Sequence, residues 1–132
     1  MNQLKCGYGL LAGLLLAFCA CSSSNPLAPF QPEVTNTTDS FQLQATKVVN
    51  VTMDKSYLWK NTGTQATVNH ATITTAGKAR VTISDANGAI VYDKTLASSL
   101  NETTSAGATG TWTIRVRLTS YGGTLNFRVQ KV

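Results

Sequence analysis

The sequence offers few residues that could carry out acid–base catalysis or bind a metal ion. The chain has 132 residues, with one histidine, His70, and six carboxylates. One imidazole cannot make a histidine-rich metal site, and the chain lacks both a G-x-S-x-G elbow and a phosphate-binding loop. A Ser-His-Asp set would need His70 beside Asp85 or Asp93. We therefore expect no catalytic residue, metal or cofactor, and we interpret His70 as an ordinary strand residue.

Three arginines are the best candidates for binding. Arg115 and Arg117 alternate with apolar residues, and so does Arg128 further along the chain. If the two segments form a hairpin, Arg115 faces Arg128, and facing like charges destabilise a strand pair by up to about 1 kcal/mol. A bound phosphate or carboxylate would relieve that repulsion. We predict an anion-binding surface of Arg115, Arg117 and Arg128, unless Asp93 or Glu102 on a neighbouring strand neutralises it.

Aromatic residues give a second candidate surface. Strand alternation cannot bury all of Tyr57-Leu58-Trp59, and Tyr121 precedes Gly122 in an expected turn. Exposed aromatic rings offer flat apolar faces on which sugar rings can stack. Tyr57, Trp59 and Tyr121 therefore support a carbohydrate-binding alternative, and ordinary core packing is the competing interpretation.

The first 20 residues have the pattern of an export signal. Lys5 is the only charged side chain before an uncharged apolar segment, residues 8–20. As a helix, about 13 residues rise only ~20 Å, which is less than the ~30 Å of a hydrocarbon core. A basic start, a short apolar segment and small residues at its end are typical of a cleaved signal peptide.

The end of this segment, Phe18-Cys19-Ala20-Cys21, resembles a bacterial lipobox. The resemblance implies cleavage after Ala20 and attachment of acyl chains to Cys21. Phe18 departs from the leucine that the family usually has. Ser22, rather than aspartate, follows the cysteine, which implies sorting to the outer membrane of the cell envelope.

Cysteine usage agrees with this interpretation. Cys6 and Cys19 would leave with the signal peptide, and Cys21 would carry lipid. The mature protein would then have no disulfide, although it faces an oxidising compartment. Its fold must rest on packing alone.

Residues 21–40 are predicted to be a lipidated cysteine followed by a disordered tether. They contain all three prolines of the chain, together with many Ser, Thr and Asn residues. An extended segment of ~19 residues could reach roughly 60 Å. We expect it to hold a globular domain, residues 41–132, away from the membrane.

The domain has the two-residue apolar period of β-strands. Residues 41–45 alternate apolar and polar side chains, and Val49, Val51 and Met53 continue the odd positions. No apolar stripe of helical period persists through two turns. Several such strands with glycine-containing turns predict an all-β fold, an antiparallel β-sandwich or jelly roll.

Two hairpins are expected. In the first, residues 85–88 form a tight turn because Asn and Gly tolerate positive φ. Ile83 then faces Ile90, and Arg80 faces Asp93. In the second, a turn at residues 119–124 returns the chain, and the side chains on its inward face are Trp112, Ile114, Val116, Leu118, Leu125, Phe127 and Val129.

Residues 76–132 resemble pre-peptidase C-terminal domains. The sequences Gly110–Val116 and Gly123–Val129 are similar to the carboxy-terminal strands of that family, and Ala76–Ile83 with its turn is similar to the middle hairpin. The resemblance implies a small secreted β-sandwich that serves as a non-catalytic accessory of a peptidase and supplies no catalytic residues. No peptidase is attached here, which departs from the family.

The sequence therefore predicts a lipid-anchored envelope protein with a signal peptide (1–20), a tether (21–40) and a β-sandwich (41–132). We expect a binding or structural module for an anionic envelope polysaccharide or a protein partner. The alternatives are a carbohydrate-binding accessory module, a subunit of a surface assembly and a small secreted hydrolase. The net charge of +5 is modest for a nucleic-acid partner, which we do not expect.

Overall fold

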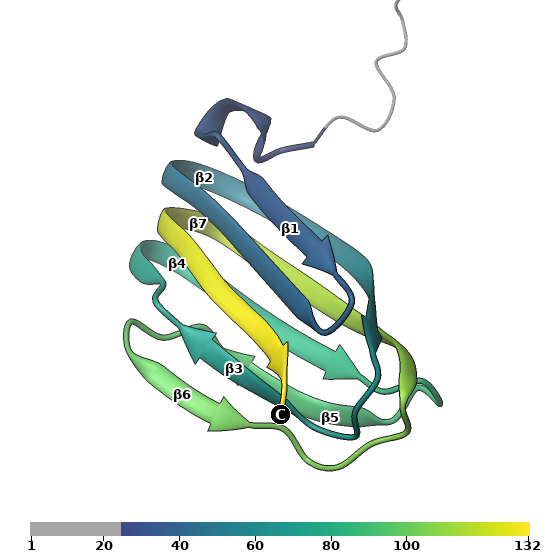
Figure 1. Cartoon of the computed structure of the whole chain (residues 1–132). Coiled ribbons are helices and arrows are strands. Elements are labelled where there is room, and N and C mark those ends of the chain that lie inside the picture. The colour runs from purple at the N-terminus through teal and green to yellow at the C-terminus, as the bar shows by residue number, and fades with distance from the viewer. Residues whose placement is uncertain (1–24) are drawn as a thin grey trace, which may run out of the picture.

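Seven antiparallel strands form most of the part of the chain that this computed structural model describes, residues 25–132 (Figure 1). The predicted all-β, antiparallel fold is confirmed. The elements, in chain order, are the 3₁₀-helix η2 (Ala28–Phe30) and the strands β1 (Glu33–Thr37), β2 (Ser40–Asn61), β3 (Ala66–His70), β4 (Ile73–Ser84), β5 (Ile90–Thr95), β6 (Leu100–Thr103) and β7 (Gly110–Lys131).

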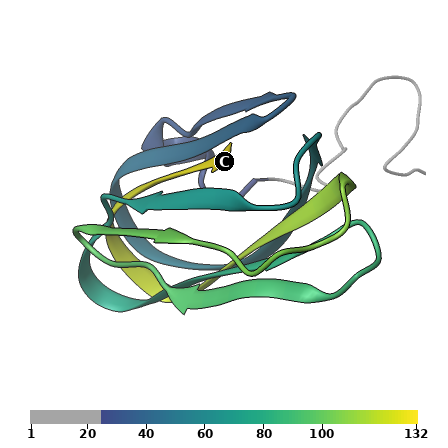
Figure 2. The same ribbon diagram turned by 60° about the horizontal axis from the view of Figure 1, so that its bottom comes forward.

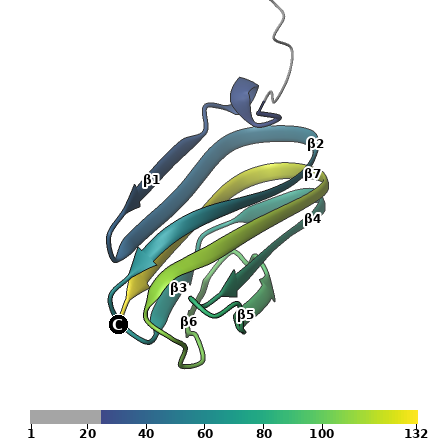
Figure 3. The same cartoon turned by 90° about the vertical axis from the view of Figure 1, so that its right-hand side faces the viewer.

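The strands form two layers that share β2 and β7, each 22 residues long. The first half of β2 pairs with the second half of β7, and β1, β3 and β6 complete this layer in the order β1-β2-β7-β3-β6. We call this layer sheet I. The second half of β2 pairs with the first half of β7, and β4 and β5 extend this layer, sheet II. Figure 2 shows the two layers stacked, and Figure 3 shows how the long strands curve from one into the other.

The curvature comes from irregular backbone at the middle of each long strand. In β2 the register shifts between Ala45 and Met53, and Lys47 and Asn50 have positive φ angles of 53° and 51°. In β7 Ser120 (43°) and Gly123 (138°) have positive φ. Bulges of this kind bend a strand and increase its twist. We call this end of the sandwich the bend end.

The second predicted hairpin is wrong, because residues 119–124 bend β7 without reversing it. Each half of β7 pairs with a different half of β2, so Leu118 lies opposite Met53 and Leu125 lies opposite Ala45. A pair of glycines is compatible both with a hairpin turn and with a strand that bends from one sheet into the other, so it does not distinguish the two. The inward-facing set is nevertheless confirmed, because all seven of its side chains are buried.

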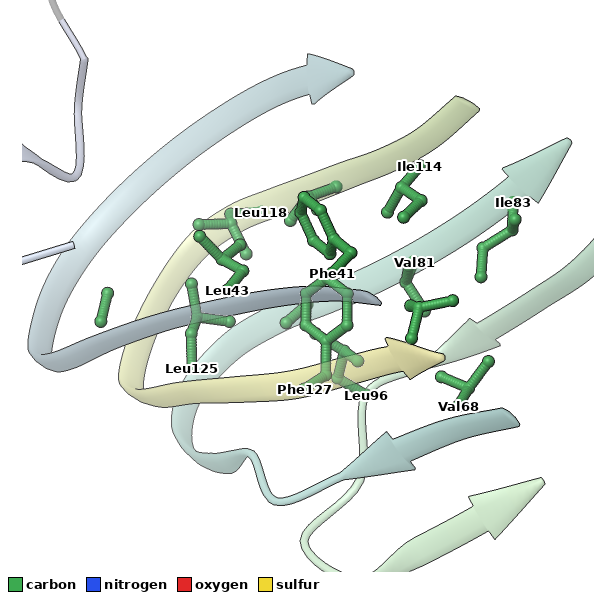
Figure 4. Close-up of a cluster of buried hydrophobic side chains, with 14 of the residues drawn as sticks. Phe41, Leu43, Val68, Val81, Ile83, Leu96, Ile114, Leu118, Leu125 and Phe127 are labelled. Atoms are coloured by element: carbon green, nitrogen blue, oxygen red, sulfur yellow. The ribbon is translucent and has the colours of Figure 1, made fainter. Parts of the chain in front are cut away.

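The core lies between the two layers (Figure 4). Trp59 and Trp112 meet edge to face with ring centroids 5.9 Å apart, and Phe41 lies 5.9 Å from Phe127. Val49 departs from the predicted odd register and is 68% exposed. The bulge at Lys47 moves the inward position to Val48.

The predicted tether is wrong from about residue 27 onward. Leu27 is only 1% exposed within the core, and β1 pairs with β2 from Glu33 to Thr37. All five residues of β1 are exposed, so this edge strand has no apolar alternation to reveal it. The signal peptide and Cys21 lie outside the described residues.

The first predicted hairpin is confirmed as a turn, but its register is wrong. Ile83 lies opposite Tyr92 and Ser84 opposite Ile90, with a bulge between the two pairs. Ile90 is therefore 63% exposed. Arg80 still reaches Asp93 along a diagonal, with 2.8 Å between Nε and Oδ1.

Candidate functional site

The predicted arginine surface does not form as one patch. Arg115 and Arg117 project from the outer face of sheet II, while Arg128 projects from the outer face of sheet I. Arg128 lies opposite Gln42 and Asn69, not opposite Arg115. The prediction that Arg115 and Arg128 face each other is wrong because it rested on the second hairpin.

On sheet II the arginines have protein partners. Arg115 donates to both carboxylate oxygens of Asp54, at 2.8 and 2.6 Å, and these bonds lower the pKa of Asp54. Arg80 pairs with Asp93 through a single hydrogen bond from Nε to Oδ1. Arg117 lies between these pairs, opposite Asp54 and Arg80, and its Nε is buried without a partner. A carboxylate does neutralise Arg115, but it is Asp54 and not the expected Asp93 or Glu102.

Two of the three predicted aromatic contacts are core residues. Trp59 is 1% exposed, and its Nε1 donates to the carbonyl of Thr37 at 3.1 Å. Tyr121 is fully buried, and its hydroxyl donates to the carbonyl of Ile73 at 3.0 Å. Neither ring can stack on a ligand, so the aromatic surface was wrongly predicted for them.

The third aromatic, Tyr57, is only partly exposed. Its ring packs on Phe41 with centroids 5.2 Å apart, and Lys55 Nζ lies 5.5 Å from the ring centroid. Leu58 is the exposed member of the Tyr57–Trp59 cluster.

His70 is the start of a chain of hydrogen bonds that joins the two sheets. Its Nδ1 accepts from the amide of Ala97 at 3.0 Å, so Nε2 carries the proton and donates to the Tyr92 hydroxyl at 2.8 Å. That hydroxyl donates to Glu102 Oε1 at 2.8 Å. Burial lowers the pKa of His70 and raises that of Tyr92. The imidazole is therefore a neutral, buried group that links the two sheets. It forms no hydrogen bond with Asp85 or Asp93.

This chain of hydrogen bonds ends at a shallow groove of about 530 Å³ between β5 and β6. Lys94 Nζ lies 3.6 Å from Glu102 Oε2, and Asp93 pairs with Arg80. Each charged side chain of the groove therefore has a partner of opposite charge. The residues that line it are Val91, Tyr92, Asp93, Lys94, Glu102, Thr103 and Ser105. This arrangement ties two sheet edges together, and the side chains of Asp93, Lys94 and Glu102 remain partly exposed in the groove.

The outer face of sheet I carries a set of side chains that sequence reasoning missed. Gln42 of β2 lies opposite Arg128 of β7, which lies opposite Asn69 of β3, and Asn69 lies opposite Asn101 of β6. Neighbouring strands are about 4.8 Å apart, so this row spans roughly 14 Å. We call the full set the amide face: Gln42, Gln44, Asn69, Asn101, Asn126, Arg128 and Gln130.

The amide face keeps most of its hydrogen-bonding capacity free. Within it, Gln42 Nε2 donates to Asn126 Oδ1 at 3.3 Å, and Arg128 Nη2 donates to Gln42 Oε1 at 3.4 Å. Both distances are long for such bonds. Among residues 25–132, no carboxylate forms an ion pair with Arg128. Glu33 on β1 flanks the face opposite Gln44.

Each amide occupies an outward position that the alternation of its own strand predicts. Their assembly into one surface depends on strand order, because β3 and β6 reach β7 only in the folded sheet. Asparagine is depleted in strands, and its presence in β3, β6 and β7 was the one available signal.

No protein-family model matches the chain, and no curated protein sequence matches it. Across residues 25–132, no group of three or more His, Cys, Asp or Glu side chains is placed to hold a metal ion. No helix in that part of the chain is long and apolar enough to cross a membrane.

Proposed function

We propose that the protein is a lipid-anchored protein of the bacterial cell envelope, held in the outer membrane through Cys21. Its sandwich is a non-catalytic module that binds a polar envelope polymer across the amide face. The observation that carries this proposal is the row Gln42–Arg128–Asn69–Asn101, which crosses four adjacent strands of sheet I. The anchor rests on the lipobox resemblance of residues 18–21.

The chemistry of the amide face suits a polysaccharide that carries amide and carboxylate groups, such as peptidoglycan. Each Asn or Gln side chain offers both donors and an acceptor, which match hydroxyl and acetamido groups. Arg128 lies within the set, and its guanidinium can bind a carboxylate with two parallel hydrogen bonds. A row of side chains that spans roughly 14 Å across four strands suits an extended polymer better than a small molecule.

Sheet II is the less suitable surface for an anion. A ligand that binds Arg115 there would compete with Asp54, which already occupies its guanidinium. With Arg128 as the single unpaired cation of the amide face, binding of an anionic polymer should weaken with salt by the contribution of about one charge. The non-catalytic role agrees with what the resemblance to pre-peptidase C-terminal domains implies.

Co-sedimentation of the purified mature protein with insoluble peptidoglycan tests the proposal. We expect Arg128→Gln combined with Asn69→Ala to lower the bound fraction at least tenfold. Arg115→Gln is the matched control, because it changes the same residue type on the other outer face and should leave binding intact. Equal binding by both variants, or no binding by the wild-type protein, would refute the amide face as the site.

A further inference from the structure

The chain between the lipid anchor and the folded domain is short. Leu27 is already in the core, and it follows Cys21 by six positions, with five residues between them. At 3.3–3.6 Å per residue this segment spans at most about 20 Å, one third of the reach expected for the full tether. A lipid on Cys21 therefore keeps the sandwich next to the membrane surface.

The N-terminal segment reaches the sandwich at its bend end. In the antiparallel pair β1–β2, Glu33 lies opposite Gln44. Residues before Glu33 therefore continue alongside those that follow Gln44, which is where β2 bends at Lys47. Figure 1 shows η2 beside this bend. The bend end is consequently the part of the domain closest to the anchor.

Two large apolar residues and two lysines are exposed at the bend end, among small and uncharged polar side chains. Val49 is 68% exposed and Ile73 is 57% exposed, although both are large apolar residues. Lys47 and Lys78 are also exposed, and neither forms an ion pair within residues 25–132. We call these four residues the bend-end surface.

The bends of β2 and β7 and the start of β4 lie side by side. Gly123 lies opposite both Val48 and Thr74, and Lys78 lies opposite Thr119. A side chain at Gly123 would overlap the carbonyl oxygen of Ile73, which shows how closely β4 approaches β7. The segments 45–53, 71–79 and 119–124 contain no Asp or Glu.

We infer that the bend-end surface lies on the anionic lipid surface in which the protein is anchored, an inference that rests on the proposed lipidation of Cys21. Lysines are attracted to anionic head groups, and aliphatic side chains enter the boundary between head groups and acyl chains. The domain then stands on its bend end. The opposite end, with the turn at residues 85–88, points away from the membrane, and the amide face stays open at the side.

Site-specific fluorescence quenching tests the inference. The mature chain would contain no cysteine besides the lipidated Cys21, so a dye can be attached at Val49→Cys, Ile73→Cys or, as the control, Asn87→Cys in the distant turn. Each lipidated protein is reconstituted into vesicles of phosphatidylglycerol and phosphatidylethanolamine that carry a head-group nitroxide. We expect quenching at residues 49 and 73 to exceed that at residue 87 at least twofold. Lys47→Gln with Lys78→Gln should reduce the excess.

The outcomes separate this inference from the proposed function. Mass spectrometry of the mature protein and loss of vesicle association in Cys21→Ala establish the anchor first. If the anchor is present and residue 49 is quenched no more than residue 87, the docking of the bend end is refuted while lipidation and polymer binding stand. If Cys21 carries no lipid, the anchor and the docking are both refuted.

Discussion

Leu27→Ala tests where the folded domain begins. Leu27 is 1% exposed in the core, whereas a disordered tether would leave it in solvent. The substitution removes three carbon atoms, worth about 2.4 kcal/mol at ~0.8 kcal/mol per methylene, and the residual cavity adds to this loss. We expect the free energy of unfolding to fall by about 3 kcal/mol. At about 4 °C per kcal/mol for a domain of this size, the melting temperature should fall by roughly 12 °C.

Urea denaturation of a soluble form that begins at residue 22 provides the assay, with fluorescence of the buried Trp59–Trp112 pair as the signal. Val34→Ala on β1 is the control, because Val34 is 44% exposed and should change stability by less than about 0.5 kcal/mol. Leu27→Met keeps the volume and should cost less than about 1.5 kcal/mol. A loss in Leu27→Ala no larger than in Val34→Ala would refute the packing of residue 27 and, with it, the short membrane tether.

Two further predictions concern the bend and the buried histidine. Gly123→Ala should destabilise the domain far more than Gly88→Ala in urea denaturation. Both glycines have positive φ, but only at Gly123 would an added Cβ collide with backbone atoms. Equal losses of unfolding free energy in the two variants would contradict this prediction. Burial lowers the pKa of His70, an effect that Glu102 opposes and Lys94 strengthens. When the pH falls below the ordinary histidine pKa of about 6.5, the unfolded chain therefore binds a proton at this residue more readily than the folded chain does. Stability should therefore fall between pH 7 and pH 5, by at most about 1.4 kcal/mol per pH unit, and the fall should be smaller in His70→Gln; an unchanged pH dependence in the variant would count against the neutral buried imidazole.

Strand alternation predicted the buried face of β7 because it is a local property. Every second side chain of a strand points to the same side, so Trp112, Ile114 and Val116 face the core whatever the strand pairs with. The same alternation resumes at Leu125 beyond the bend. It cannot distinguish a hairpin from a strand that crosses between sheets, because the inward residues are the same in both cases.

Pairing registers were harder to predict because bulges add residues that carry no sequence mark. The bulge after Ile83 shifted the β4–β5 register. The bulge at Lys47 made Val48 the buried residue in place of the expected Val49. Edge strand β1 has five exposed residues and is held by backbone hydrogen bonds to β2, which depend little on side-chain type.

The sequence by itself determined the all-β class, the inward faces of the strands and the turn at residues 85–88, because each depends on residues close together in the chain. Tertiary structure alone decided which strands are neighbours. That choice separated Arg115 from Arg128, gave Arg115 to Asp54, and brought the amide face together from β2, β7, β3 and β6. Surfaces built across a sheet depend on strand order, and strand order arises from the burial of all the inward faces at once.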